Sequence, residues 1–559
     1  MRCRPFLLLG LVLALGLDTG LRGAADPDSD LASRVVILAN SADADSVVLA
    51  HYYAEKRGVP AANIIALKLP AAEIITRAEF DTQLYQPLQD ELIRLKWLDG
   101  YPVPVAAGAA PNPRARYSII SNRISYLVVC RGVPLFVGSD GSPDDNPQFT
   151  SRNIQLRHND AAVDAELALL PRKGWPLMAF VANPVFNRER PVPLIAQQIV
   201  KVARLDGPTL ADARRLVDNA LAAEAVGLVG RGYIDIGGPH ADGDKWLEEA
   251  AQALAALGFD TDVDRANPAT LAPESRFDAP ALYFGWYSAT VNGPFAREDF
   301  RFPPGAVALH IFSFSASTLR DPRRAWLAAL VARGVTGTVG NVSEPFLQFT
   351  HEPQLLLRAL ARGDMLGDAA AYAIPYFSWM GVLIGDPLYR PFKVSLDEQW
   401  RDRATLPAEL RPYVLLRRMR LLVAAGKAAE AVALGQEAQR EGFRLPVALT
   451  LADVQRAAGD QAGARRSLAP ALAAATPLTA ADAPLLATVA ARYAALDEPK
   501  SALQAWRRLL EISGLPAEGR TAWLRQAAAA AQAAKDRDLA ADWEAELWML
   551  TSRSAAPAK

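Results

Sequence analysis

Two stretches of the chain decide the fold: Ala281-Leu-Tyr-Phe-Gly-Trp-Tyr-Ser288 and Ala306-Val-Ala-Leu-His-Ile-Phe-Ser-Phe-Ser-Ala-Ser317. Each is a short apolar run that ends in small polar residues, which is typical of a buried parallel strand that stops at a sheet edge. In open α/β sheets, ligands and catalytic groups gather at that edge. The two stretches therefore predict where the protein acts, although their residue types do not form a recognised catalytic set.

Strands and helices alternate on both sides of these stretches. The predicted strands are 34–39, 63–68, 125–130, 200–205, 232–237, 261–264 and 335–340. The predicted helices are 46–56, 77–98, 210–224, 246–257, 323–333, 352–361 and 366–373. This alternation favours an α/β fold with parallel strands joined by right-handed crossovers. We expect two such domains, an N-terminal one over 26–190 and a second over 191–400.

The composition changes after about residue 400, where Ala, Leu, Arg and Gln dominate and strand signals vanish. Four related motifs recur every 33 to 38 residues: Ala425-Gly-Lys-Ala-Ala-Glu-Ala431, Ala458-Gly-Asp-Gln-Ala-Gly-Ala464, Leu496-Asp-Glu-Pro-Lys-Ser-Ala502 and Ala534-Lys-Asp-Arg-Asp-Leu-Ala540. Each is typical of a tight turn between two helices. Residues 401–559 thus resemble degenerate tetratricopeptide-type repeats. Such a solenoid implies a protein partner, and a helical cap on the α/β part is the alternative.

The N-terminus predicts export. Arg2 and Arg4 precede the apolar run Leu7–Leu17, and Gly23-Ala-Ala25 is a suitable cleavage site, so residues 1–25 are predicted to be a signal peptide. An uncleaved anchor is the alternative. No later apolar run is long enough to span a bilayer, so no membrane span is expected after cleavage.

Composition restricts the partners. The formal net charge of −1 over 559 residues argues against nucleic-acid binding. Cys130 is the one cysteine left after cleavage, so no internal disulfide is expected, and its place in an apolar strand favours a small buried side chain. We predict no cofactor and no metal.

Six further stretches carry a resemblance to a known family: Val36-Ile-Leu-Ala-Asn40, Tyr53-Ala-Glu-Lys-Arg-Gly-Val-Pro60, Ala203-Arg-Leu-Asp-Gly-Pro208, Phe284-Gly-Trp-Tyr-Ser288, Gly340-Asn-Val-Ser-Glu-Pro345 and Gly385-Asp-Pro-Leu-Tyr-Arg-Pro391. With them, residues 34–400 resemble a family of exported bacterial proteins from genomes that carry an exosortase-type sorting system. That resemblance implies a periplasmic or extracellular location and brings no established activity.

The order of these stretches also resembles, more distantly, the caspase-like fold of the gingipain-type cysteine peptidases. There, one strand ends in a His-Gly pair and the next strand ends in a Cys. Here Trp286 or Tyr287 stands in the place of the His, and Ser313 or Ser315 stands in the place of the Cys. The resemblance implies a caspase-like parallel-sheet core with helices on both faces, and the altered residues put its peptidase chemistry in doubt.

A serine in this place needs a base, because its hydroxyl is a poor nucleophile until its proton is removed. The indole of Trp286 only donates and cannot serve. His310 lies on the same predicted strand as Ser313 but on its opposite face. His240 is the better candidate and His351 a third. The alternative for Ser313 and for Ser315 is that small residues permit a tight turn.

Polar and aromatic residues at other strand ends are candidate binding residues: Asp206, Asp235, Trp286, Tyr287, Asn341 and Glu344. Carboxylates at one edge could hold a hard cation or act as acid and base, but they lack the spacing of a metal-binding loop. For Asp206 the alternative is a cap on the following helix. Trp286 and Tyr287 suit stacking on sugars or apolar groups, and core packing is the alternative.

Three functions stay open from the sequence. The favoured one is a catalytically altered caspase-like protein that binds a peptide or an envelope polymer. The second is a serine hydrolase that uses Ser313 or Ser315 with His240. The third is a scaffold that acts through its helical repeats.

Overall fold

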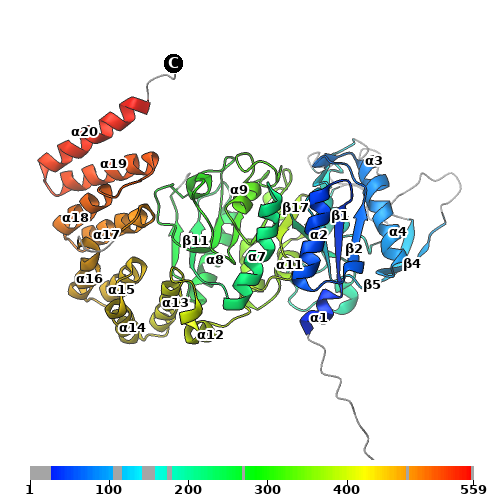
Figure 1. The fold of residues 1–559 in the computed structure, drawn as a ribbon, viewed down its shortest axis with the longest axis horizontal. Helices are drawn as coiled ribbons and strands as arrows, with labels where there is room; N and C mark the ends of the chain where they lie inside the picture. Colours follow the sequence, from blue (N-terminus) through cyan, green and yellow to red (C-terminus); the bar gives the residue numbers. More distant parts are fainter. Residues whose placement is uncertain are drawn as a thin grey trace, which may run out of the picture.

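The computed structural model describes residues 27–104, 116–140, 156, 158–172, 179–266, 271–473 and 478–554. Figure 1 shows an α/β body that carries an arm of paired helices, drawn in yellow to red. The predicted signal peptide, 1–25, lies outside the described residues. Within the described part of the chain, no helix is both long and apolar enough to cross a membrane.

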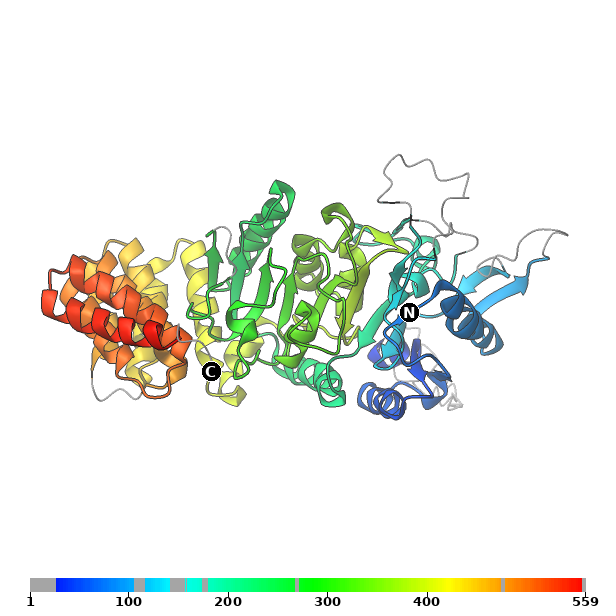
Figure 2. The ribbon, with the colours of Figure 1, turned by 90° about the horizontal axis from the view of Figure 1, so that it is seen from above.

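A ten-stranded sheet forms the centre of the body (Figure 2), in the order β12-β11-β13-β14-β15-β17-β10-β6-β1-β2. Its strands are β1 (Val35–Asn40), β2 (Ile64–Leu67), β6 (Tyr126–Cys130), β10 (Lys201–Leu205), β11 (Arg231–Asp235), β12 (Thr261–Asp264), β13 (Pro280–Gly285), β14 (Val307–His310), β15 (Gly337–Asn341) and β17 (Gly381–Gly385). The predicted α/β class with a largely parallel sheet is therefore confirmed. The strands come from both 26–190 and 191–400, so one sheet runs through both predicted stretches.

The sheet consists of two parallel groups, β12 to β15 and β10 to β2, separated by β17. β17 is antiparallel to β15. β17 meets β10 at a single bridge, Arg204 with Ile384, whose hydrogen-bond pattern is that of parallel strands. The contacts at the strand ends nevertheless show that β17 and β10 run in opposite directions. Lys201 at the start of β10 bonds Asp368, and the neighbouring Gly367 N–H donates to the Pro387 carbonyl just after β17. The end of β17 thus lies beside the start of β10.

Both parallel groups end at the same edge of the sheet. Arg320, on the loop after β14, donates to Asp206, which directly follows β10, at 2.5 Å. Leu319 on the same loop donates its N–H to Glu73 at 2.9 Å, and Glu73 lies beyond the end of β2. These two hydrogen bonds join the loop after β14 to residues that follow β10 and β2. The carboxyl ends of the two parallel groups of strands therefore form one continuous edge.

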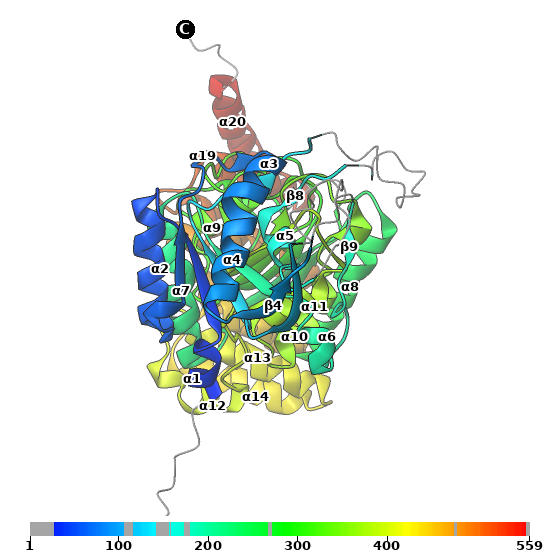
Figure 3. The ribbon, with the colours of Figure 1, turned by 90° about the vertical axis from the view of Figure 1, so that its right-hand side faces the viewer.

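Helices cover both faces of the sheet (Figure 3). One face carries α2 (Ala44–Arg57), α7 (Leu210–Val226) and α9 (Trp326–Ala332). The other carries α4 (Gln86–Arg94), α5 (Val163–Leu167), α8 (Ala241–Ala256), α10 (Pro353–Ala361) and α11 (Leu366–Ala373). Short additional helices are α1 (Pro27–Ala32), α3 (Arg77–Glu79), α6 (Pro193–Ala196) and α12 (Leu396–Arg401). Because the inner strands are buried on both faces, β1, β6 and β13 are largely apolar rather than alternating.

The structure differs from the expected elements at three points, the first of which is that the sequence did not predict β17. The stretch 306–317 is a strand only as far as His310, and the polar residues after it form a loop that leads to α9. The predicted helix 77–98 ends at Arg94 and is followed by a hairpin of β4 (Leu98–Pro102) and β5 (Tyr117–Asn122). Other small strand pairs are β9 (Val181–Ala182) with β16 (Tyr376–Phe377), and β3 (Ile74–Ile75) and β8 (Ala161–Ala162) with β7 (Phe136–Val137).

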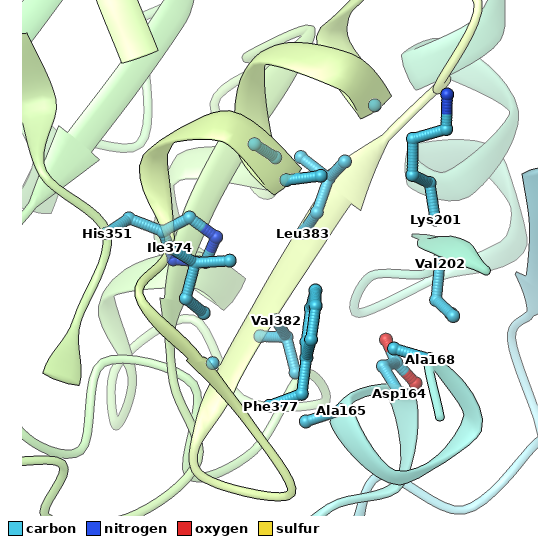
Figure 4. Close-up of a pocket in the computed structure, with 14 residues that line it drawn as sticks. Asp164, Ala165, Ala168, Lys201, Val202, His351, Ile374, Phe377, Val382 and Leu383 are labelled. Atoms are coloured by element: carbon cyan, nitrogen blue, oxygen red, sulfur yellow. The ribbon is translucent and has the colours of Figure 1, made fainter. Parts of the chain in front are cut away.

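A small cavity of about 30 Å³ lies where β17 and β10 are held together by only one residue pair (Figure 4). Its walls include Val382, Phe377, Lys201 and the buried His351. It has room for about one or two water molecules and for no larger ligand.

The C-terminal arm consists of helix pairs, which confirms the predicted helical repeats in outline. The helices are α13 (Arg411–Ala424), α14 (Ala428–Glu441), α15 (Leu445–Ala457), α16 (Gln461–Leu468), α17 (Ala483–Ala495), α18 (Pro499–Leu510), α19 (Ala517–Ala533) and α20 (Arg537–Ser554). Each predicted motif forms the turn inside one pair. The second residue of every motif has positive φ: Gly426, Gly459, Asp497 and Lys535. The four turns therefore share one left-handed helix end although their sequences differ.

The first repeats are attached to the α/β body by a buried ionic cluster around Arg231. Arg231, at the start of β11, contacts Asp260 at 2.8 Å and Asp262 at 2.9 Å. Arg420 of α13 also bonds Asp260, and the Tyr413 hydroxyl of α13 donates to Asp278 at 2.7 Å. Burial opposes ionisation of Asp260, yet the positive charges of Arg231, Arg420 and Arg276 hold its pKa below the usual range.

We predict that Arg231→Met lowers the free energy of unfolding by about 3 to 5 kcal/mol, because it leaves buried carboxylates without their counter-charge. Arg265→Met, which breaks the exposed pair with Glu248, is the matched control and should change it by about 0.5 kcal/mol or less. Urea unfolding followed by circular dichroism measures both. Equal effects of the two substitutions would contradict this account of the cluster.

Candidate functional site

A cavity of about 290 Å³ lies at the carboxyl ends of β11, β13, β14 and β15. Its walls are Pro239, His240, Trp286, Tyr287, Ile311, Phe312, Ser313, Asn341, Glu344, Pro345, Leu347 and Thr350. Six of the nine candidate residues from the sequence thus meet in one place: His240, Trp286, Tyr287, Ser313, Asn341 and Glu344. Ser315, Asp206 and Asp235 are not among the lining residues.

Ser313 lies on the loop that follows β14 and is half-buried at the cavity wall. The turn is closed by the Ser315 N–H, which donates to the Phe312 carbonyl at 3.2 Å. His240 is exposed on the opposite loop, where it precedes α8. Among the interactions of the described residues, no hydrogen bond joins His240 to Ser313. The two groups share the cavity without forming a nucleophile–base pair.

The other two candidate bases are buried away from the cavity. His310 Nδ1 lies 2.9 Å from the Tyr283 hydroxyl, and its Nε2 accepts from the Ser288 N–H at 3.1 Å. His351 belongs to the small cavity beside β17. Burial lowers the pKa of each to about 3, so both rings are neutral at pH 7. Neither lines the cavity that holds Ser313.

Trp286 forms a wall of the cavity rather than a stacking platform. Its side chain is buried, and its Nε1–H donates to Asp244 at 2.7 Å. A Cβ at Gly238 or at Gly243 would lie 2.0 or 2.1 Å from an indole atom, so the ring fills space that only glycine leaves open. This packing favours the core alternative for Trp286.

Tyr287 is exposed, unlike its neighbour Trp286, and the peptide bond between the two residues is cis. The Tyr287 side chain is 39% exposed, and its ring packs edge-on against Phe312 with centroids 5.2 Å apart. These two rings, which come from the loops after β13 and β14, form an apolar rim that is open to a ligand.

Asn341 and Ser315 hold the floor of the site together. Ser315 is fully buried, and its Oγ accepts the backbone N–H of Asn341 at 3.0 Å. The Asn341 side chain donates to Thr350 Oγ1 at 2.9 Å, because the turn at Leu347–Phe349 brings the chain back over β15. Ser315 is therefore a structural residue of the tight turn. Thr350 and Leu347 had no sequence signal, since only that return of the chain places them in the site.

Glu344 is the exposed acidic group at the mouth of the cavity. One of its carboxylate oxygens accepts the Phe346 N–H at 2.9 Å, which fixes its position. It is the one acidic side chain among the lining residues.

Asp206 belongs to a separate buried network. It contacts Arg204 at 3.4 Å and Arg320 at 2.5 Å, and Arg204 also contacts Asp164 at 2.6 Å. The alternative role as a helix cap is wrong, because Thr209 caps α7 together with Asp212. Asp206 instead ties the loop after β14 to the end of β10.

Asp235 lies under the sheet edge, near Tyr283. It is fully buried, and no cation pairs with it among the described residues. Burial, and secondarily the charge of Asp264, raises the pKa of Asp235 to about 8. Its carboxyl group is therefore largely protonated at neutral pH. Within the described part, no group of three or more His, Cys, Asp or Glu side chains is placed to hold a metal ion.

Comparisons with known proteins found matches among solved structures that cover less than a third of the chain. No family model and no curated protein matches the chain. Among the solved structures that match are two crystal structures, both described as TPR-like repeats of a protein assigned as a kinesin light chain from Podosopora anserina, one of them carrying a point substitution. They are 22% identical, cover 29% and 28% of this chain and 86% and 84% of their own, and have a TM-score of 0.20. So low a score carries no argument about function.

We predict that Asp235→Asn removes a pH dependence of stability. The folded state keeps a proton up to about pH 8, whereas an unfolded Asp releases it near pH 4, so the free energy of unfolding falls as the pH rises between these values. The slope is at most about 1.4 kcal/mol per pH unit. Urea unfolding at pH 5 and pH 8 should show a smaller difference in Asp235→Asn than in the wild type.

The matched control is Asp242→Asn, an exposed carboxylate in the first turn of α8. It should keep the wild-type difference between the two pH values. A wild-type slope that survives in Asp235→Asn would show that other groups cause it.

Proposed function

We propose that the α/β body binds a segment of a peptide or of an envelope polymer in the cavity at the ends of β11, β13, β14 and β15, and does not cleave it. The observation that carries this proposal is the lining of the cavity. Tyr287 and Phe312 offer open apolar rings, while Ser313 stands without a base bonded to it. A serine hydroxyl in that state is a hydrogen-bonding group rather than a nucleophile.

The size of the cavity supports a limited contact with a longer molecule. About 290 Å³ is at the lower end of the volumes of small-molecule sites. It accommodates one or two side chains, or one sugar ring, of a polymer that continues over the surface. The exposed position of Tyr287 and Glu344 at the mouth suits such a continuing ligand.

A caspase-like identity of the core and a location outside the cytoplasm are parts of the same proposal. The site lies at the ends of neighbouring parallel strands, which is where a caspase-like fold would hold its His and Cys. In this chain Trp286, which packs against Gly238 and Gly243, stands in the place of that His. An exported protein with this change would recognise its ligand without peptidase chemistry.

We predict that Tyr287→Ala and Ser313→Trp each lose most of the bound fraction in two assays, cosedimentation with purified peptidoglycan sacculi and capture of a fluorescein-labelled casein digest. The first substitution removes the rim ring, and the second fills the cavity. The class of molecule that the wild type retains identifies the ligand.

The matched control is Tyr101→Ala, which removes a tyrosine that is 56% exposed on β4, outside the cavity. It should bind like the wild type. Wild-type binding by both cavity variants would refute the site.

A serine hydrolase is the second candidate, because Ser313 and His240 line the same cavity from facing loops. The Ser313 hydroxyl and the His240 ring would have to approach each other when a ligand binds, since catalytic hydrogen bonds often tighten only in the complex.

We predict that a fluorophosphonate probe does not label the purified wild-type protein. Labelling that is lost in Ser313→Ala and His240→Ala, and retained in the control Ser343→Ala, would replace the binding proposal by the hydrolase. Ser343 is suitable as the control because it follows β15 but does not line the cavity.

A further inference from the structure

A groove of about 490 Å³ lies where the chain passes from the α/β body to the first repeat. Its walls are formed by α12, the turn at Arg403–Thr405, and parts of α13, α14 and α15. Only the first repeat has α12 and this turn beside it. The groove is therefore a feature of the junction and not a surface that recurs along the solenoid.

Four exposed arginines line the groove: Arg401, Arg403, Arg411 and Arg444. Within the described part of the chain, none of them forms an ion pair with a carboxylate. Two exposed glutamates of α14, Glu437 and Glu441, stand among the lining residues as well. The lining of the groove thus keeps an excess of positive charge.

Backbone carbonyls hold three of these guanidinium groups in position, and one of the three is Arg444, which donates to the carbonyl of the preceding Phe443 at 2.8 Å. Arg411 donates to the carbonyls of Leu406 at 2.8 Å and Ala404 at 2.7 Å, and Arg403 donates to the carbonyl of Trp400 at 2.9 Å. A guanidinium has five N–H donors, so each group retains donors for a ligand. Because the groups are already fixed, a carboxylate that binds them costs little further ordering.

The rest of the groove is apolar. Pro412, Leu415 and Val447 line it and are buried, with Leu434 partly buried beside them. The ring of Trp400 is covered by Arg403 at 4.3 Å and by Arg418 at 4.9 Å from its centroid. Cation–π contacts thus already engage the Trp400 ring, on which a base of single-stranded nucleic acid would otherwise stack.

We propose that this groove is a docking site for an acidic peptide segment of a protein partner. Carboxylates of the peptide pair with the four arginines, and an aliphatic side chain between them packs on Leu415 and Val447. Glu437 and Glu441 on the α14 wall disfavour ligands that are anionic along their whole length, such as nucleic acid or an anionic lipid surface. This inference is independent of the cavity at the sheet edge.

The test is fluorescence anisotropy of the full-length protein with a fluorescein-labelled octapeptide, Glu-Leu-Glu-Gly repeated twice. A peptide with Gln in place of each Glu is the matched ligand control. We expect the acidic peptide to bind, the Gln peptide to bind at least about tenfold more weakly, and the affinity to fall with added salt. The double variant Arg401→Glu/Arg444→Glu should weaken binding of the acidic peptide by about tenfold or more.

The control variant is Arg456→Glu, which reverses an exposed arginine of α15 outside the groove and should leave the affinity unchanged. Circular dichroism establishes that all variants are folded. Equal binding of the Glu and Gln peptides, equal loss in both variants, or stronger binding of an oligothymidine or of anionic vesicles than of the acidic peptide would overturn the proposal.

Discussion

The buried contacts of Arg231 hold the two parts of the protein in one arrangement. Its guanidinium lies at the start of β11 and faces Asp260, Asp262 and Asp278, which precede or begin the neighbouring strands. Two of these carboxylates also contact α13, since Asp278 accepts from Tyr413 and Asp260 pairs with Arg420. A charge buried at this depth is stable only with its partners in place, so strand position and repeat docking depend on each other.

This cluster also explains why the two proposed surfaces do not compete. The repeats are attached at the amino ends of β11 to β13, whereas the candidate cavity lies at the carboxyl ends of the same strands. A partner on the first repeat therefore leaves the mouth of the cavity open. Strands of one hydrogen-bonded sheet thus contact the first repeat at one end and support the cavity at the other.

The chemistry of the cavity follows from how two residues are packed. Trp286 is enclosed by glycine backbone and bonded to Asp244, so it shapes the site and does not react. The buried Ser315 hydroxyl accepts the Asn341 N–H and does not line the cavity. Of these two serines, only Ser313 presents its hydroxyl at the cavity wall. The polar residues that follow two apolar strands thus divide into a supporting set and an exposed set, and this division favours ligand recognition over catalysis.

The sequence by itself determined nine of the ten strands of the sheet, most helices, the four repeat turns and the edge at which the site lies, because apolar runs, caps and turn residues act locally. It did not predict β17. It also selected six residues that line the cavity. Only the tertiary structure decided their roles. The burial of Ser315, the Thr209 cap that frees Asp206 for Arg320, and the protonated state of Asp235 depend on neighbours far apart in the chain. The direction of β17 was likewise undecided, since pairing between distant strands leaves no local pattern.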